Sequence, residues 1–203
     1  MEGNMSRVPV ILAGNQKETA MSRIPVPATI SDAPAASQPL LEAVKKQLGV
    51  APNLFRLVSH SPAALQGYVG LSGALSKGAL PAATRERIAL AIAEINGCDY
   101  CLSAHSYLGQ NLAKISPQEV ALNRNGESGD TKADAAVRFA TKVVRERGHV
   151  TEAEIKAVRT AGFSDSQIVE IIALVAENCF TNFLNEAAKT DIDFPVVRAA
   201  KAA

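Results

Sequence analysis

Several features are scarce or absent in this sequence, and each absence excludes a class of protein. The chain has only three cysteines in 203 residues, too few for the disulfide framework of a small secreted protein. Its 21 Lys and Arg nearly balance 20 Asp and Glu without forming blocks, so no basic surface points to nucleic acid or an anionic membrane. No apolar run approaches the roughly 20 residues that cross a bilayer, and "VPVILAG" is too short for a convincing signal peptide. We expect a cytoplasmic protein without nucleic-acid or membrane partners.

Sustained period-two alternation of apolar residues is also absent, which argues against β-strands. From Ser37 onward, apolar residues recur at helical spacing, and capping residues mark the ends of the expected helices. Gly49 is a natural C-cap for "QPLLEAVKKQLG". Capping boxes are predicted from Ser116 to Glu119 and from Thr151 to Glu154. The sequence therefore predicts an all-α fold.

The chain divides into a helical domain and two flanking segments. Residues 1–36 are rich in Pro, Ala and Ser, lack a helical period, and are expected to form a flexible or surface-draped arm. This arm contains an echo, "MSRVPV" at Met5 and "MSRIPV" at Met21. Residues 37–195 form the helical domain and residues 196–203 a tail. "ERIALAIAEING", beginning at Glu86, resembles "EIIALVAENCF", beginning at Glu170, so the domain is either built from two related helical units or shows shared helical composition.

The stretch "INGCDYCLSAHSYLG" carries the residues with the most distinctive chemistry. Cys98, Cys101 and His105 are spaced i, i+3 and i+7, which places them within about 60° of arc on one helix face. Asn96-Gly97 breaks the preceding helix, so both cysteines lie in a first turn, where the positive end of the helix dipole favours a thiolate. A thiolate with a base and a second thiol nearby can reduce a peroxide and then close a disulfide.

Other interpretations of this stretch are weaker. A zinc site would have three ligands from Cys-x-x-Cys-x-x-x-His and lacks a credible fourth. A structural disulfide across two residues would constrain little, and buried inert residues would not need this register. We therefore expect no metal site.

A carboxylate can complete a proton relay with the histidine. If the helices before and after Gly97 form an antiparallel hairpin, Glu94 lies near the level of the cysteines and Glu86 within about one turn of His105. Geometry alone leaves both carboxylates open.

The pattern of Glu86, Cys98-Asp-Tyr-Cys101 and His105 resembles the core motif of the AhpD-like alkylhydroperoxidases in the carboxymuconolactone decarboxylase superfamily. The preceding "APNLFRLVSHSPAALQGYVGLSGALSKGAL" is similar to the peroxidase-related branch, and the resemblance runs from about Ser37 to Pro195. It implies a compact AhpD-like helical fold that assembles as a homo-oligomer, a trimer or hexamer.

The resemblance also implies residue roles and partners. Cys101 would be the peroxidatic thiol, Cys98 the resolving thiol, and His105 with Glu86 the proton relay. The implied activity is (alkyl)hydroperoxide reduction without a bound cofactor, using an external dithiol or lipoyl-type reductant protein. Tyr100 stands where some family members have histidine, so an extra relay through this position is not expected. Two alternatives stay open: a lyase or isomerase acting on a small acid or lactone, and a redox-sensing protein without turnover.

The remaining candidates favour structural interpretations. Cys179 lies in an apolar helical stripe and is expected in the core. His60 and His149 are expected at the surface, although His60 and Tyr68 could also line a pocket. Four apolar residues between positions 54 and 71 are expected in the core, at a subunit interface or around a substrate: Leu54, Phe55, Leu57 and Leu71.

Overall fold

The structure is a computed structural model that describes residues 22–200. Over this range the chain is helical and contains no strand, which confirms the all-α prediction. The α-helices are α1 (Gln38–Leu48), α2 (Asn53–Val58), α3 (Pro62–Leu75), α4 (Ala82–Ile95), α5 (Asp99–Asn111), α6 (Pro117–Arg124), α7 (Thr131–Arg145), α8 (Glu152–Thr160) and α9 (Asp165–Ala188). Two short 3-10 turns, η1 (Ile30–Asp32) and η2 (Ala35–Ser37), precede them.

Helix boundaries follow local chemistry, with one exception. Gly49 ends α1 in the left-handed region with φ 85°, as predicted. The capping box from Thr151 to Glu154 is complete in α8. In α6 only half of the predicted box forms: the Ser116 hydroxyl accepts from the backbone N–H of Glu119. The Glu119 carboxylate instead accepts hydrogen bonds from Arg87, Asn123, Ser128 and the Gly129 amide. These contacts fix the loop between α6 and α7.

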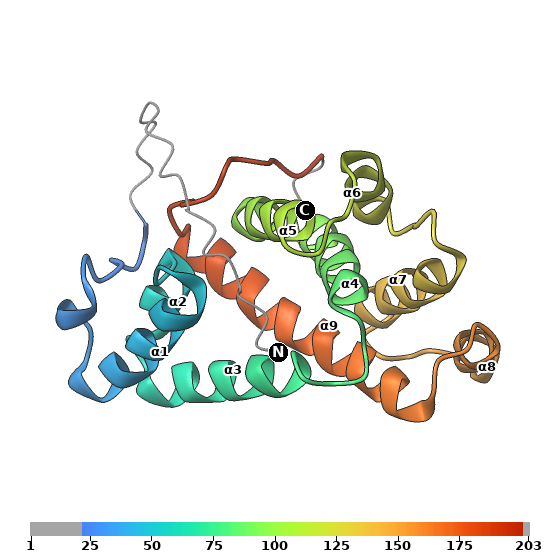
Figure 1. Cartoon of the computed structure of the whole chain (residues 1–203), viewed down its shortest axis with the longest axis horizontal. Helices are drawn as coiled ribbons and strands as arrows, with labels where there is room; N and C mark the ends of the chain where they lie inside the picture. Colours follow the sequence, from blue (N-terminus) through green and yellow to red (C-terminus); the bar gives the residue numbers. More distant parts are fainter. Residues whose placement is uncertain (1–21, 201–203) are drawn as a thin grey trace, which may run out of the picture.

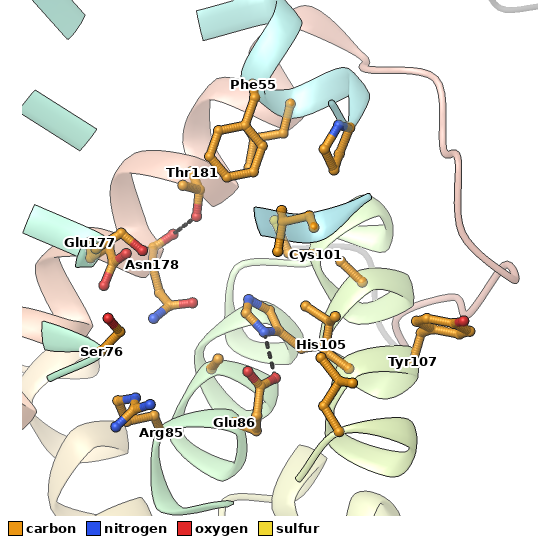
Figure 2. A pocket seen from close by; sticks show the side chains of 18 of the residues that line it. Phe55, Ser76, Arg85, Glu86, Cys101, His105, Tyr107, Glu177, Asn178 and Thr181 are labelled. Carbon is orange, nitrogen blue, oxygen red and sulfur yellow. Dashed lines mark hydrogen bonds and ion pairs between the residues drawn. The ribbon is translucent and has the colours of Figure 1, made fainter. Parts of the chain in front are cut away.

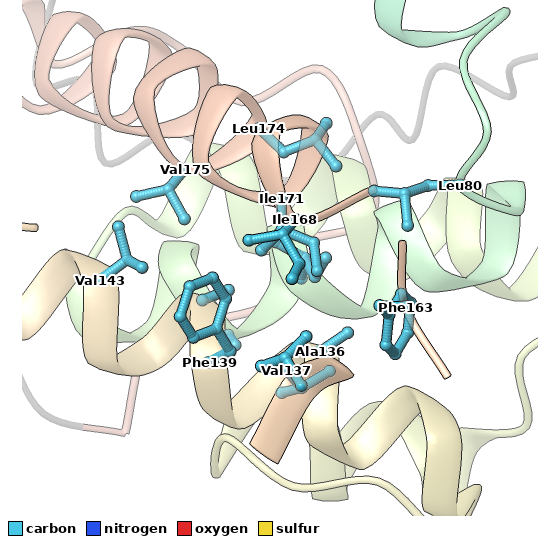
Figure 3. Packing of buried hydrophobic residues seen from close by; sticks show 14 of the residues in the cluster. Leu80, Ala136, Val137, Phe139, Val143, Phe163, Ile168, Ile171, Leu174 and Val175 are labelled. Carbon is cyan, nitrogen blue, oxygen red and sulfur yellow. The ribbon is translucent and has the colours of Figure 1, made fainter. Parts of the chain in front are cut away.

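Helix α4 is the centre of the molecule and packs against α5, α6, α7 and α9 (Figure 1). One apolar core lies between α4, α7 and α9 (Figure 3), with Ile88, Val137 and Ile171 fully buried. A second core surrounds α5 and contains Cys98 and Cys101. The two cysteines therefore lie inside packed structure and are held rigidly by it.

Helix α9 crosses the molecule beneath α4 and α5 (Figure 1). It is long and apolar enough to meet the length and composition criterion for a membrane span, which the sequence prediction overlooked. Its buried face packs on α3, α4, α5 and α7, as expected of a core helix. That face also carries buried polar residues, among them Asn182 and Asn185, and brings Asn185 to Cys101 in α5.

The segments outside the helices contact the domain at several points. Of the predicted N-terminal arm, residues 1–21 lie outside the described residues; they include the whole first copy of the echo and Met21, the first residue of the second copy. The described part binds the domain through the Arg23 amide, which donates to the Ala188 carbonyl, and through Arg56, which donates to the Pro27 carbonyl. Residues 189–200, here the C-terminal strap, run along α5.

Candidate active site

The turn between α4 and α5 places the two cysteines. Gly97 has φ 66°, a conformation that other residues adopt rarely, and lets the chain reverse directly after α4. Cys98 is the N-cap of α5, and its Sγ accepts a hydrogen bond from the backbone N–H of Cys101 at 3.3 Å. Both sulfurs are thus at the positive end of α5, where a thiolate is stabilised.

The two thiols are free and form one hydrogen-bonded pair. Cys98 Sγ donates to Cys101 Sγ at 2.7 Å, and both side chains are buried. The hydrogen bond to Cys101 and burial raise the pKa of Cys98 far above its usual value. Burial also opposes ionisation of Cys101, but the hydrogen bond from Cys98, the positive charge of His105 and amide donors outweigh it and lower its pKa. These effects therefore make Cys101 the thiol that ionises more readily and Cys98 the one that retains its proton.

His105 lies one turn after Cys101 and contacts Glu86. Figure 2 shows the imidazole and the carboxylate facing each other, with 2.9 Å between His105 Nδ1 and Glu86 Oε2. Burial disfavours the imidazolium, but the charge and hydrogen bond of Glu86, together with the charge of Cys101, outweigh it and raise the pKa of His105. The arrangement favours an imidazolium beside a thiolate.

Of the two carboxylates that sequence geometry left open, Glu86 is the one at the histidine. Glu94 accepts from Arg124 Nε at 2.7 Å and from the Ala200 amide at 2.6 Å, so it ties α4 to α6 and to the C-terminal strap. Glu94 is therefore a salt-bridged side chain and not part of the histidine pair.

Tyr100, between the cysteines, has its hydroxyl turned away from the sulfurs. It donates to Asp193 Oδ1 at 2.8 Å and accepts from the backbone N–H of Leu54 at 3.1 Å. Burial, followed by the charge of Asp193, raises its pKa well above the usual value, so the phenol stays protonated. Tyr100 joins α5 to α2 and to the C-terminal strap.

A cavity of about 760 Å³ opens beside Cys101, His105 and Glu86. Most of its wall is apolar, with Leu54, Phe55, Tyr68, Leu75, Ala104, Leu108, Leu112, Leu174 and Phe194. Cys101 contributes to this wall and Cys98 does not. A small molecule in the cavity therefore reaches Cys101 first.

The other sequence candidates are placed as follows. Cys179 is half-buried against the first core, with Asn96 Nδ2 at 3.8 Å from its sulfur. His60 and His149 are exposed, and His60 Nε2 contacts the Pro25 carbonyl at 2.7 Å. Leu57 is buried, Leu71 is exposed, and neither lines the cavity. Among the described residues, no group of three or more His, Cys, Asp or Glu side chains is arranged to hold a metal ion.

Sequence reasoning missed the residues that α9 contributes. Asn185 Nδ2 donates to Cys101 Sγ at 3.3 Å, and both are buried. Glu177 lines the cavity, where burial raises its pKa despite Ser72, His105 and Arg85 nearby. One signal was available: Asn178, Asn182 and Asn185 fall at i, i+4 and i+7 within a mostly apolar helix face. Buried amides at such spacing indicate a polar contact inside the core.

Comparison with known proteins agrees with this fold and motif. Residues 62–146, which contain Glu86, Cys98, Cys101 and His105, match the model of the Carboxymuconolactone decarboxylase family. The alkylhydroperoxidase AhpD core of an uncharacterized peroxidase-related protein from Ralstonia eutropha JMP134 is 27% identical, with a TM-score of 0.75 over 84% of this chain and 92% of that one.

Two further solved structures share the fold. An uncharacterized peroxidase-related protein from Silicibacter sp. TM1040 is 24% identical, with a TM-score of 0.74 over 88% of this chain and 95% of that one. The debrominase Bmp8 is 23% identical, with a TM-score of 0.68 over 82% of this chain and 90% of that one. A comparison with curated protein sequences finds no match. The match over residues 62–146 and the shared fold show that this region is similar to the Carboxymuconolactone decarboxylase family and that the chain has an AhpD-like fold.

Proposed function

We propose that this protein is a thiol-dependent hydroperoxide reductase. The observation that carries the proposal is the surroundings of Cys101. Its sulfur faces a cavity, has a depressed pKa, and lies next to a second thiol and the His105–Glu86 pair. Peroxide reduction needs these same parts: a thiolate, a proton donor for the leaving oxygen, and a resolving thiol.

The proposed cycle has three steps. The Cys101 thiolate attacks the terminal oxygen of ROOH, the O–O bond breaks, and the leaving RO⁻ takes a proton from the His105 imidazolium to give ROH. The Cys98 thiol then attacks the Cys101 sulfenic acid; its proton leaves with the hydroxide as water, and the Cys98–Cys101 disulfide forms. An external dithiol reduces this disulfide by thiol–disulfide exchange, and His105 regains its proton. No bound cofactor enters the cycle.

Glu86 and His105 act together in this cycle. The Glu86 carboxylate fixes the imidazole at Nδ1, which leaves the other ring nitrogen to exchange a proton. Because the imidazolium is stabilised by Glu86, its charge also stabilises the thiolate before attack.

The shape of the cavity supports organic hydroperoxides as substrates. Its volume of about 760 Å³ greatly exceeds the roughly 30 Å³ occupied by a water-sized molecule. An apolar wall stabilises an alkyl or aryl group by removing it from water. We expect cumene hydroperoxide to have a higher kcat/KM than hydrogen peroxide.

The decisive variants are the three single Cys→Ser changes. With a dithiol reductant, Cys101→Ser abolishes peroxide consumption. Cys98→Ser abolishes turnover but still consumes one equivalent of peroxide, leaving a sulfenic acid that dimedone traps. Cys179→Ser is the matched control and keeps wild-type activity, because Cys179 lies outside the site. Full activity in Cys101→Ser would show that the proposed chemistry is wrong.

One alternative is a lyase or isomerase acting on a small acid or lactone, supported by the match to the Carboxymuconolactone decarboxylase family. General acid and base groups would suffice for it, so turnover would survive the double Cys98→Ser, Cys101→Ser change. A non-catalytic redox sensor would form the disulfide under peroxide without sustaining turnover. The debrominase structure in complex with 2,3,4-tribromopyrrole makes a halogenated pyrrole a useful additional assay compound.

A further inference from the structure

Helix α9 brings two buried amides to the reactive end of α5. Asn182 and Asn185 are respectively 0% and 2% exposed. Asn185 Nδ2 donates to Cys101 Sγ at 3.3 Å, while its Oδ1 has no hydrogen-bond partner within residues 22–200. A buried amide whose single polar contact is a sulfur has no evident structural function to explain its presence.

The neighbouring amide is oriented by the turn that carries the cysteines. Asn182 Oδ1 accepts a hydrogen bond from Asn96 Nδ2 at 2.9 Å. This contact directs Asn182 Nδ2 to the opposite side, where it is buried without a hydrogen-bond partner in the described part of the chain. Asn185 and, more weakly, Asn182 favour the ionised form of Cys101, but only Asn185 makes a hydrogen bond to its sulfur. Hydrogen bonds to ionised acceptors are stronger than those to neutral ones, so the unpaired N–H of Asn182 favours a nearby thiolate over a thiol.

The sulfur atoms of Cys98 and Cys101 accept hydrogen bonds from different donors. Cys98 Sγ accepts only the backbone N–H of Cys101 among the hydrogen bonds of the described residues, and donates its own proton to Cys101. Cys101 Sγ accepts from Cys98 and from Asn185. The helix dipole acts on both cysteines and does not distinguish them, whereas the charge of His105 and the side-chain amides favour ionisation of Cys101, so the amides contribute to the asymmetry alongside His105.

We propose that Asn185, supported by Asn182, acts alongside His105 to hold the negative charge on Cys101 rather than on Cys98 and so helps to determine which cysteine is the nucleophile. The importance of these amides for peroxide turnover rests on the proposed function. Their effect on the ionisation of Cys101 does not depend on that function and is measured separately.

The test uses full-length protein carrying Cys98→Ser and Cys179→Ser, which leaves Cys101 as its single thiol. The rate of Cys101 alkylation by iodoacetamide is followed against pH, and its midpoint reports the thiol pKa. Asn185→Leu, close in size and without a donor, is expected to raise the midpoint by about one pH unit, lowering the rate at pH 7 about tenfold. The rate on the alkaline plateau stays unchanged, and Asn182→Leu shifts the midpoint in the same direction.

Two additional variants separate ionisation from packing. Asn185→Ala also removes the donor but reduces volume, so a midpoint shift shared with Asn185→Leu comes from the lost hydrogen bond, and either variant suffices if the other fails to fold. Asn123→Leu replaces an equally buried amide that contacts Glu119 and the Glu127 carbonyl, and it leaves the midpoint unchanged.

Unchanged midpoints in folded Asn185→Leu and Asn185→Ala proteins would overturn the inference. So would a rate reduced equally at every pH, which indicates a structural effect alone. If the midpoint shifts but wild-type protein consumes no peroxide, the inference about Cys101 stands and the proposed reductase activity fails.

Discussion

At the scale of single residues, the site depends on where one charge and one proton reside. The His105–Glu86 contact at 2.9 Å raises the pKa of His105, and the resulting positive charge helps to lower that of Cys101. Removing the Glu86 charge should therefore affect Cys101 through His105. The two shifts have opposite directions, so both favour a thiolate beside an imidazolium.

Glu86→Gln tests this coupling. Without the carboxylate, the pKa of His105 falls, the imidazolium is lost at a lower pH, and the pKa of Cys101 rises. In the pH profile for kcat/KM with a hydroperoxide, the acid limb, which follows ionisation of Cys101, should move to higher pH and the alkaline limb, which follows His105, to lower pH, and kcat/KM at pH 7 should fall about 10- to 100-fold. Glu94→Gln is the control, because Glu94 pairs with Arg124. Matching profiles for the two variants would contradict the assigned relay.

The sequence predicted the local part of the site and missed the distant part, for a physical reason. Cys98, Cys101, His105 and Glu86 belong to one helical hairpin, so helix periodicity and the Gly97 turn bring them together. Asn185 lies 84 residues after Cys101, and its approach depends on how α9 packs across α4 and α5. No local pattern encodes that packing.

At the scale of secondary-structure elements, the C-terminal strap is hydrogen-bonded to α5, whose first turn carries Cys98 and Cys101. The Ser103 hydroxyl accepts from the Val197 amide at 2.9 Å, and Asp99 accepts from the Ala199 amide at 2.8 Å. Tyr100 joins the strap at Asp193 and α2 at Leu54. The tail expected from residue 196 onward contributes the Val197 and Ala199 contacts, which sequence composition alone did not indicate.

Tyr100→Phe separates anchoring from catalysis. The change leaves the Leu54 N–H without its acceptor, so the free energy of unfolding should fall by about 1–3 kcal/mol, measured by urea denaturation. Peroxidase kcat/KM of the folded variant should stay within about threefold of wild type, since the hydroxyl faces away from the sulfurs. Lost activity with unchanged stability would instead place Tyr100 in a proton relay.

At the scale of the whole molecule, α9 has a second apolar face that points outward. Val169, Ile172, Phe180 and Phe183 are between 41% and 65% exposed and follow one another along the helix. Contiguous exposed apolar side chains favour contact with another protein surface. Together with the oligomer that the family resemblance implies, this outer face of α9 is our proposed interface between copies of the chain.

Phe183→Glu tests that interface. We expect light scattering coupled to gel filtration to give the mass of a trimer or hexamer for wild type and a smaller species for the variant, because an ionised side chain is costly to bury. Val196→Glu, at a 57% exposed position on the strap, is the control and keeps the wild-type mass. A wild-type monomer at all concentrations would exclude the proposed assembly.

The central claim is that Cys98 and Cys101 form a redox-active pair that cycles with hydroperoxide and dithiol. The most direct measurement is mass spectrometry of the native protein after one equivalent of hydroperoxide, before and after addition of dithiol. The account predicts a Cys98–Cys101 disulfide, seen as the loss of two hydrogens, which dithiol reverses and a second peroxide pulse restores. Stoichiometric zinc in the native mass, or thiols unchanged by peroxide, would contradict it.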